Sequence, residues 1–173
     1  DQIKKKLKNS IFKVIDTGLE HGSITIVLDR SKFEITTLRK DEKSDGRHAE
    51  ISYTTDWEED SKRRDFTINA IYLDRKGQIF DPQNGRNDLK EKNLKFIGNT
   101  SKRIQEDYLR IIRFIRFSIQ YDSIYSDPKV IESIKLNLNG LKKLSKERIF
   151  NELNKILFLK NITILLKNTE LKN

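Results

Sequence analysis

One segment of this sequence combines arginines with a carboxylate at a spacing that could bind an anion or a polar ring. In EDYLRIIRFIRF (106–117), Arg110, Arg113 and Arg116 recur every third residue, and Asp107 precedes Arg110 by three residues. On a helix these side chains form one slowly drifting stripe. The apolar residues between them point almost all round the helix, so we expect the helix to be largely buried. A buried guanidinium without a partner is costly, and the stripe must therefore face carboxylates, water or an anionic ligand.

The spacing leaves two interpretations of this stripe open. In the first, the arginines make structural ion pairs. In the second, they form the polar wall of a nucleotide site, in which Asp107 and Arg110 hydrogen-bond a base edge and Arg113 and Arg116 meet phosphate. The chemistry of the second is sound, because a carboxylate accepts from an exocyclic amino group while a guanidinium donates to a ring nitrogen or carbonyl oxygen.

Two other places carry polar residues beside expected strands. RRDFTINA (63–70) puts Arg64 and Asp65 at the entry to a strand, where they are either a helix cap with a solvated charge pair or part of a site. Glu34 lies between two apolar residues of an expected strand, so alternation puts it on the face opposite to them. Its side chain is then exposed to solvent or directed into a cleft.

The first half of the chain has the patterns of short strands. Residues 23–38 contain two β-branched runs around a polar break, which predicts a β-hairpin, and residues 68–80 predict a second hairpin. A short strand is expected at 13–16, after a helix over 3–12. Residues 39–50 are charged and nearly devoid of apolar side chains, which indicates a mobile surface loop. Together these elements predict a small mixed sheet.

The second half has the periodicity of helices. After Asp81-Pro82, leucine, isoleucine and phenylalanine recur at helical spacing, and Pro128 is the last proline. The predicted elements are helices over 87–92, 101–121, 127–136 and 145–159, and an apolar turn at 162–166. We therefore expect two domains, an α/β head over 1–99 and a helical neck over 100–173.

Composition bounds the partners. With 35 Lys and Arg against 26 Asp and Glu, the net charge is +9, which favours a polyanionic partner, nucleic acid ahead of an anionic membrane. Cysteine is absent, which excludes disulfides and thiolate metal sites and fits a reducing compartment, so we expect the cytosol. No apolar run approaches the ~20 residues of a membrane span, and the first ten residues lack a signal-peptide core. Methionine is absent too, so we expect the chain to have been cut or processed upstream of Asp1.

Three motifs in a fixed order carry a family resemblance. RRDFTINA, DPQNGRNDL and EDYLRIIRFIRF, in this order and spacing, resemble the class II CCA-adding enzymes and bacterial poly(A) polymerases. FEITTLR (33–39), DGRH (45–48) and KERIFNEL (146–153) extend the resemblance to nearly the whole chain. A single motif is weak evidence, whereas the ordered set is specific.

The resemblance implies a fold and an activity. The fold would be α+β, a nucleotidyltransferase head of the polymerase β type with a small mixed sheet, followed by an all-α neck. The activity would be that of an RNA 3′-end nucleotidyltransferase, adding CCA to tRNA or poly(A) to RNA. In this family the aspartate and arginine of the EDxxR motif, here Asp107 and Arg110, act as an amino-acid template that pairs with ATP or CTP.

The resemblance also implies roles for the other polar residues. Arg64 and Asp65 would lie near the ribose, and Arg113 and Arg116 would point toward the triphosphate or the RNA backbone. Glu34 matches the additional carboxylate of the active-site sheet and is the one catalytic residue we assign.

The sequence departs from the family at its metal site. Members begin with a glycine-rich GGxVRD segment and an Asp-x-Asp pair that holds two divalent metals, and neither occurs here. Glu34 alone cannot hold such a pair, so we expect no metal site in this chain, and Mg²⁺ only in a complete enzyme. The missing ligands would come from upstream residues of the same protein or from a separate N-terminal fragment. The C-terminal RNA-binding body and tail of the family are also missing.

Three functions remain open at this point. In the first, the chain is part of an enzyme whose partners are ATP or CTP and the 3′ end of a tRNA or other RNA, with no membrane partner. In the second, it is a catalytically inactive remnant that retains weak nucleotide or RNA binding. In the third, it is an unrelated basic RNA-binding module whose arginines serve phosphate contacts only. The ordered motifs argue against the third.

Overall fold

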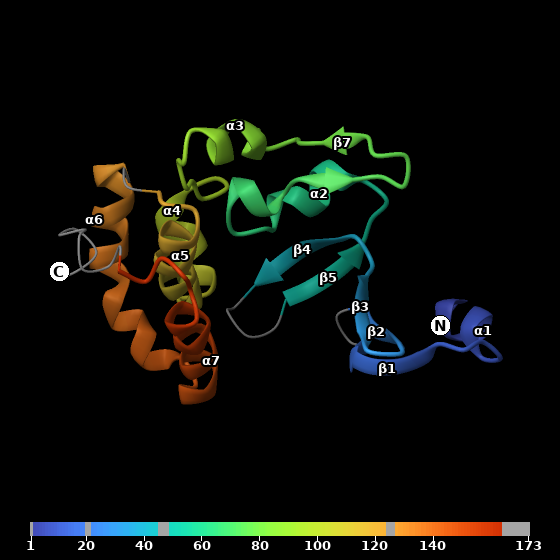
Figure 1. Ribbon diagram of the computed structural model, residues 1–173. Coiled ribbons are helices and arrows are strands. Elements are labelled where there is room, and N and C mark those ends of the chain that lie inside the picture. Colours follow the sequence, from blue (N-terminus) through green and yellow to red (C-terminus); the bar gives the residue numbers. More distant parts are fainter. Residues whose placement is uncertain (1, 20–21, 45–48, 124–126, 164–173) are drawn as a thin grey trace.

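A computed structural model describes residues 2–19, 22–44, 49–123 and 127–163 (Figure 1). The N-terminal half consists of short strands and helices. They are α1 (Gln2–Leu7), β1 (Lys13–Gly18), β2 (Ser23–Leu28), β3 (Ser31–Thr36), β4 (Arg39–Ser44), β5 (Ala49–Tyr53), α2 (Trp57–Lys62), the 3₁₀ turn η2 (Thr67–Asn69), β6 (Tyr72–Leu73), β7 (Ile79–Phe80) and α3 (Gly85–Lys90). The C-terminal half is helical. Its elements are α4 (Thr100–Glu106), α5 (Leu109–Gln120), α6 (Pro128–Asn137), the 3₁₀ helix η3 (Leu138–Lys143) and α7 (Lys146–Leu157).

The strands form three separate antiparallel sheets. β1, β2 and β3 make one sheet, β4 pairs with β5, and β6 pairs with β7. Both predicted hairpins are confirmed, because β2–β3 covers residues 23–36 of the predicted 23–38 and β6–β7 lies within 68–80. The single mixed sheet is wrong in detail, since every strand pair in the described part of the chain is antiparallel. The short β6–β7 hairpin closes on its own turn, where the Asp74 carboxylate accepts from the backbone N–H groups of Lys76 and Gln78.

The predicted mobile loop over 39–50 is instead mostly the β4–β5 hairpin. Charged side chains do not prevent a backbone ladder from forming, and this ladder is fixed at its base. The N–H of Arg39 donates to the carboxylate of Asp60 on α2 (3.1 Å), and the N–H of Thr54 donates to the carbonyl of Leu38 (3.0 Å). Residues 45–48, which carry the DGRH motif, lie outside the described residues.

The helix expected over 101–121 is broken in two. Asn99 caps α4, which ends at Glu106, and Asp107 then has an extended backbone (φ −155°, ψ 104°) before α5 begins at Leu109. The Asp107 carboxylate accepts from the N–H of Leu109 (3.1 Å). Such a short side chain competes with the helical hydrogen-bond pattern, which explains the break at this residue.

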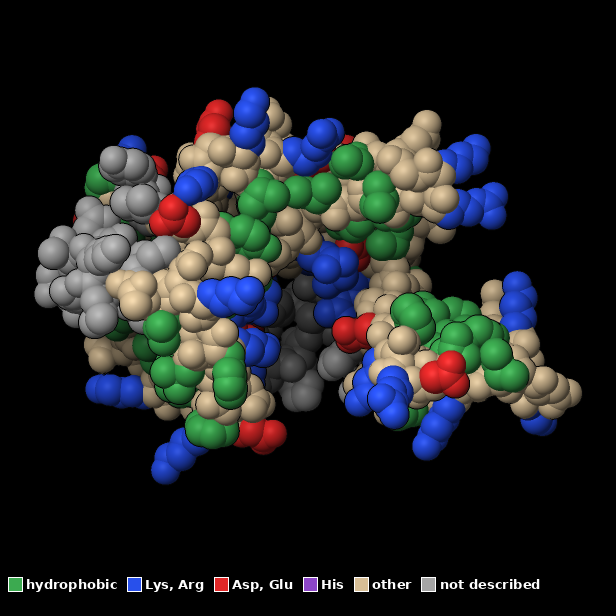
Figure 2. Space-filling model, in the orientation of Figure 1, with side chains coloured by type: hydrophobic (Ala, Val, Ile, Leu, Met, Phe, Trp, Pro, Cys, Tyr) green, Lys and Arg blue, Asp and Glu red, His purple; other side chains and the backbone are tan. Residues whose placement is uncertain are grey.

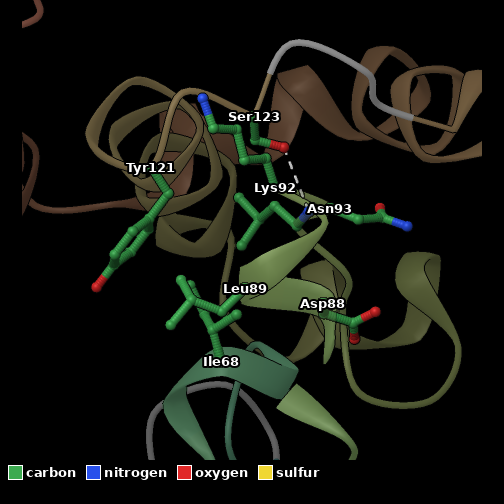
Figure 3. A pocket seen from close by; sticks show the side chains of 8 residues that line it. Ile68, Asp88, Leu89, Lys92, Asn93, Tyr121 and Ser123 are labelled. Atoms are coloured by element: carbon green, nitrogen blue, oxygen red, sulfur yellow. Dashed lines mark hydrogen bonds between the residues drawn. The ribbon is translucent and has the colours of Figure 1, made fainter. Parts of the chain in front are cut away.

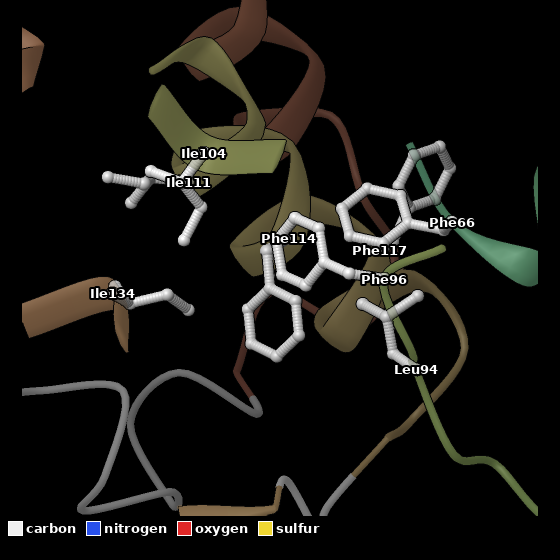
Figure 4. Close-up of a cluster of buried hydrophobic side chains, with 8 residues drawn as sticks. All are labelled: Phe66, Leu94, Phe96, Ile104, Ile111, Phe114, Phe117 and Ile134. Atoms are coloured by element: carbon white, nitrogen blue, oxygen red, sulfur yellow. The ribbon is translucent and has the colours of Figure 1, made fainter. Parts of the chain in front are cut away.

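A phenylalanine cluster joins the two halves of the chain (Figure 4). The ring of Phe66, beside the RRDF motif, lies 4.7 Å from Phe96 and 5.5 Å from Phe117, and Phe96 stacks on Phe114 at 5.6 Å. Phe66 and Phe114 are fully buried. Because Phe114 and Phe117 belong to α5, this packing fixes the arginine-bearing helix against the segment that carries Arg64 and Asp65.

A second cluster fixes α7 to α5. Leu109, Ile112 and Ile119 of α5 are buried with Ile156 of α7. α7 begins after Ser145, whose hydroxyl accepts from the N–H of Arg148, as expected for a helix over 145–159. The face of α5 away from the phenylalanine cluster is therefore covered by α7, which accounts for the predicted burial of α5.

The remaining elements follow the sequence with small shifts. α3 and α6 confirm the helices expected near 87–92 and 127–136, whereas α1 ends at Leu7 rather than at residue 12. Most of the expected turn at 162–166 lies outside the described residues. Among the helices that the structure describes, none is long and apolar enough to cross a membrane. The fold is α+β, small sheets followed by a helical portion, as predicted.

Candidate nucleotide-binding site

Arg63 and Arg64 are both held by a carboxylate that the sequence did not single out. Asp60, fully buried on α2, accepts from Nε and Nη2 of Arg63 (2.8 and 2.6 Å) and from Nε and Nη2 of Arg64 (3.2 and 3.0 Å). The hydroxyl of Tyr72 and the N–H of Arg39 also donate to it. The signal was present in the sequence, because an aspartate three and four residues before two arginines on one helix faces both of them. The expected solvated pair of Arg64 with Asp65 is therefore replaced by a buried pair with Asp60.

These hydrogen bonds decide the ionisation of Asp60. Burial alone raises the pKa of its carboxyl, but hydrogen bonds from Arg39, Tyr72, Arg63 and Arg64 outweigh burial and lower the pKa to about 2. Burial and the bond to Asp60 raise the pKa of Tyr72 to about 12. Asp60 is thus charged and Tyr72 is neutral throughout the neutral range.

Asp65 pairs with the α5 stripe. Its Oδ2 accepts from Nε and Nη2 of Arg113 (2.7 and 2.6 Å), and its Oδ1 accepts from the N–H of Phe66 and the amide of Asn69 (both 2.9 Å). Asp65 is buried, with 8% of its surface exposed. All of its strong acceptor positions are used within the protein.

A second carboxylate, on α7, binds the rest of the stripe. Glu152 is buried. Its carboxylate forms ion pairs with Nε of Arg116 (2.8 Å), Nη1 of Arg113 (3.8 Å) and Nζ of Lys155 (2.7 Å). Burial raises the pKa of Glu152, but the hydrogen bonds from Lys155 and Arg116 outweigh it and leave the pKa below its usual value. The guanidinium of Arg116 also lies 4.0 Å from the centre of the Phe117 ring. For Arg113 and Arg116 the structure therefore shows the structural ion pairs of our first interpretation.

Arg110 differs from the other arginines of the stripe because part of its guanidinium is unused. Nη1 donates to the Glu106 carboxylate and to the carbonyl of Arg103 (both 2.6 Å). Nε and Nη2 have no hydrogen-bond acceptor among the residues that the structure describes, and 14% of the side chain is exposed. Glu106 is shared with Arg103, whose Nη2 donates to the carbonyls of Arg63 and Arg64. This carboxylate, adjacent to Asp107 in the motif, was also missed from the sequence.

We expected Asp107 to share a helix face with Arg110. It does not, because Asp107 lies in the break before α5. The two residues are still adjacent, since the N–H of Arg110 donates to the carbonyl of Asp107 (3.0 Å). Oδ2 of Asp107 accepts from Nη2 of Arg148 on α7 (2.8 Å). The side chains of Asp107 and Arg148 are 28% and 45% exposed, so both reach the surface.

Glu34 lies apart from these residues. Its side chain is exposed on β3, opposite Thr25 of β2, and makes no hydrogen bond or ion pair within the described ranges. Phe33, its neighbour, is 52% exposed, so alternation along β3 does not separate a buried from a solvated face. In Figure 1 the β4–β5 hairpin lies between β3 and α5.

The acidic and imidazole side chains of the described residues do not form a metal site. No group of three or more of them, which could hold an ion, occurs there. The residues at hand therefore do not fit the Mg²⁺ that the resemblance implies for a complete enzyme, and no step through a metal follows from their geometry.

One face of the molecule is hollowed and carries basic side chains. Figure 2 shows Lys and Arg side chains on both walls of a hollow between the helical half and the strands of the first half. A separate cavity near α3 and the end of α5 measures only about 10 Å³, room for a single water (Figure 3). Among its polar groups, the N–H of Leu94 donates to Ser123 Oγ (3.2 Å). This cavity is therefore too small for a nucleotide.

Comparison with known protein families gives matches in both halves of the chain. Residues 1–95 match the family described as the poly A polymerase head domain. The chain belongs to this family. Residues 127–171 match a second family, described as the probable RNA and SrmB-binding site of polymerase A.

The relatives are CCA-adding nucleotidyltransferases. The human mitochondrial CCA tRNA nucleotidyltransferase 1 is 47% identical over 162 residues, which are 90% of this chain and 37% of that protein. The CCA-adding enzyme of Streptococcus uberis is 39% identical over 86% of this chain and 37% of its own length. The crystal structure of the Bacillus stearothermophilus CCA-adding enzyme in complex with CTP superposes with a TM-score of 0.78 at 33% identity, covering 92% of this chain and 39% of that one. The chain thus spans somewhat more than a third of these relatives.

Proposed function

We propose that this chain is the nucleotide-selecting part of an RNA 3′-end nucleotidyltransferase of the CCA-adding kind. The observation that carries the proposal is the turn between α4 and α5. There the carboxylate of Asp107 and the free Nε and Nη2 of Arg110 come from neighbouring residues of one turn, joined by the hydrogen bond from the N–H of Arg110 to the carbonyl of Asp107. The relative in complex with CTP supports a nucleotide as the ligand.

The two side chains match the base edges of cytosine and adenine. Each of these bases presents an exocyclic amino group beside a ring nitrogen that accepts a hydrogen bond. Asp107 would accept from the amino group, and Arg110 would donate to the ring nitrogen. Uracil and guanine present a carbonyl oxygen and a ring N–H at these places, so both contacts would become repulsive or unsatisfied.

The triphosphate would lie toward the more exposed arginines. The side chains of Arg64 and Arg113 are 36% and 29% exposed, whereas Arg116 is 12% exposed and bound to Glu152. Arg64 would lie near the ribose, and Asp65 would contribute by orienting Arg113, which with Arg116 behind it would attract phosphate. The relative in complex with CTP and the human CCA tRNA nucleotidyltransferase support CTP and a tRNA 3′ end as partners, and the base edge that cytosine and adenine share extends the proposal to ATP.

Transfer of the nucleotide would need more than these residues. Mg²⁺ would activate the RNA hydroxyl and neutralise the leaving pyrophosphate. Its ligands would come from an upstream part of the protein or a separate fragment, with Glu34 as an additional carboxylate of the active site. The cysteine-free composition supports a cytosolic location for the assembled enzyme.

The proposal is tested by titrating the chain with CTP, ATP, UTP and GTP at two salt concentrations. Binding is monitored through the NMR chemical shifts of the chain, which give the affinity for each nucleotide. We expect weak binding that weakens further with salt, because arginine contacts to phosphate are screened. The preference for CTP and ATP should outlast most of this salt dependence. Equal affinity for all four nucleotides would contradict the proposal.

A second test concerns catalysis. The isolated chain should not incorporate labelled CTP or ATP into tRNA in the presence of Mg²⁺, because the Asp-x-Asp pair of the family is missing from its sequence. Incorporation above a blank without protein would show that other residues of this chain hold the metals.

A further inference from the structure

Asp107 is held by the protein on both of its carboxylate oxygens. Oδ1 accepts from the N–H of Leu109 at the start of α5 (3.1 Å), and Oδ2 accepts from Nη2 of Arg148 (2.8 Å). Arg148 is 41 residues further along the chain, in the first turn of α7. Two donors at an angle to each other fix the plane of the carboxylate, and each oxygen still has a lone pair for another donor.

The backbone next to Asp107 is fixed by η3, the element that precedes α7. Tyr108, the next residue, packs against Gly140 of η3, where a Cβ atom would come within 1.9 Å of the tyrosine ring. Nζ of Lys143 lies 5.5 Å from the centre of the same ring. Residues 138–148 therefore contact the turn that carries Asp107 at two places, its backbone through Tyr108 and its carboxylate through Arg148.

The position of Arg148 is itself determined by packing. Ile156 and Glu152 hold α7 on α5, and Ser145 caps the first turn of α7. The ion pair with Asp107 adds little to stability, because both side chains are partly exposed (45% and 28%) and water screens their attraction. Its effect is on geometry, since a carboxylate held in one orientation reads a base edge more sharply than one that rotates.

We propose that Arg148 is a positioning residue for base selection, which fixes the Asp107 carboxylate in the orientation that accepts the amino group of cytosine or adenine. This inference rests on the proposed function of Asp107 and Arg110. In this proposal a residue of α7, which lies outside the motif that contacts the base, affects the selectivity for the base. The affinity for the triphosphate as such does not depend on this contact.

CTP and UTP are the sharpest probes, because they differ at the position that Asp107 would contact, an amino group in one and a carbonyl in the other. The dissociation constants of both are measured for the 173-residue chain, for Arg148→Ala, for Arg148→Lys, and for Lys146→Ala as a control of equal charge change. Lys146 is exposed, two residues from Arg148 on the same helix. Melting temperatures are recorded for each variant.

We expect Arg148→Ala to reduce the preference for CTP over UTP by about three- to tenfold, part of what a well-placed contact to a base edge provides. Lys146→Ala should weaken both nucleotides alike and keep their ratio. Arg148→Lys keeps one donor and should restore part of the preference for CTP. If the alanine variant does not fold, the lysine variant still shows whether Arg148 affects this preference. An unchanged ratio in both Arg148 variants, with the parent chain still preferring CTP, would overturn the inference and leave the proposed function standing. No preference in the parent chain would overturn both.

Discussion

Asp60 and Asp107 both bind arginine side chains, but their surroundings are opposite. Asp60 is fully buried, and its two oxygens receive Arg63, Arg64, Tyr72 and a backbone N–H. Asp107 is at the surface and receives one arginine and one backbone N–H. A carboxylate whose acceptor positions are all used inside the protein stabilises the fold, whereas one with positions left over can bind a ligand. This difference separates a structural group of charges from a candidate site within one basic molecule.

The arginines divide in the same way. Arg113 and Arg116 are bound to the buried carboxylates Asp65 and Glu152, so most of their charge is neutralised. Arg110 uses one nitrogen of three, with Glu106 and a carbonyl as its acceptors. Spacing on the helix is the same for all three. Their difference comes from which carboxylates the fold brings to each.

The largest expected effect is on stability at Asp60. Asp60→Asn should lower the free energy of unfolding by about 3 kcal/mol, the lower end of the cost of breaking a buried pair, because Arg64 still reaches water. Urea unfolding measures it. The matched control is Glu59→Gln, the same chemical change one residue away in an exposed pair with Lys62, and it should cost less than about 1 kcal/mol. Equal costs for both variants would remove the distinction between the two kinds of carboxylate.

The second effect is on the turn that carries Asp107. Gly140→Ala should lower the free energy of unfolding by about 1–3 kcal/mol, because the new methyl group would overlap the Tyr108 ring. The amide NMR signals of Asp107 and Leu109 should shift as the ring moves. Gly18→Ala is the control, since its Cβ would meet only Ser23 at 3.7 Å. A Gly140→Ala protein as stable as the parent would mean that η3 does not fix this turn.

The third effect is on selectivity. Arg110→Ala should remove the preference for ATP and CTP over GTP and UTP, a loss of about 1–3 kcal/mol of discrimination, while general binding of polyanions remains. Arg116→Ala, on the same helix, should weaken all four nucleotides alike and keep the preference. Titration of both variants with the four nucleotides compares them. If Arg116→Ala abolishes the preference and Arg110→Ala keeps it, the base-reading role belongs to the other end of the stripe.

The smallest effect is a difference in acid sensitivity. The pKa of Asp60 is about 2 in the folded protein against an ordinary value of 3.8, so its contribution to stability is complete above the ordinary value and is lost as the pH falls through 2. The stability gap between the parent and Asp60→Asn should therefore be constant from pH 7 to pH 5 and narrow from pH 4 to pH 2. Urea unfolding at each pH measures the gap. A gap independent of pH would mean that the carboxyl of Asp60 has the same pKa in the folded and unfolded states.

The local elements could largely be predicted from the sequence. β-branched runs around polar turns predicted the β2–β3 and β6–β7 hairpins, and Ser145 marked the start of α7. The ordered motifs indicated the family, which the comparisons confirm. Two local predictions were wrong, the loop over 39–50 and the continuous helix over 101–121. At 39–50 a contact from a distant residue, the Asp60 carboxylate at the base of β4, fixes a backbone that local composition does not determine. At 101–121 the carboxylate of Asp107 itself competes with the helical hydrogen bonds, and the helix breaks there.

The sequence by itself determined that three arginines recur every third residue along one largely buried helix, after a carboxylate, and that they must be paired or face a ligand. Spacing fixes which residues share a helix face, because the helical repeat is constant. Only the tertiary structure decided which arginine binds which carboxylate, since the partners Glu152 and Arg148 lie on α7 and Asp65 lies more than forty residues before Arg113. Ion pairs between separate elements depend on how those elements pack, and the packing is set by the phenylalanine and isoleucine clusters rather than by the charges.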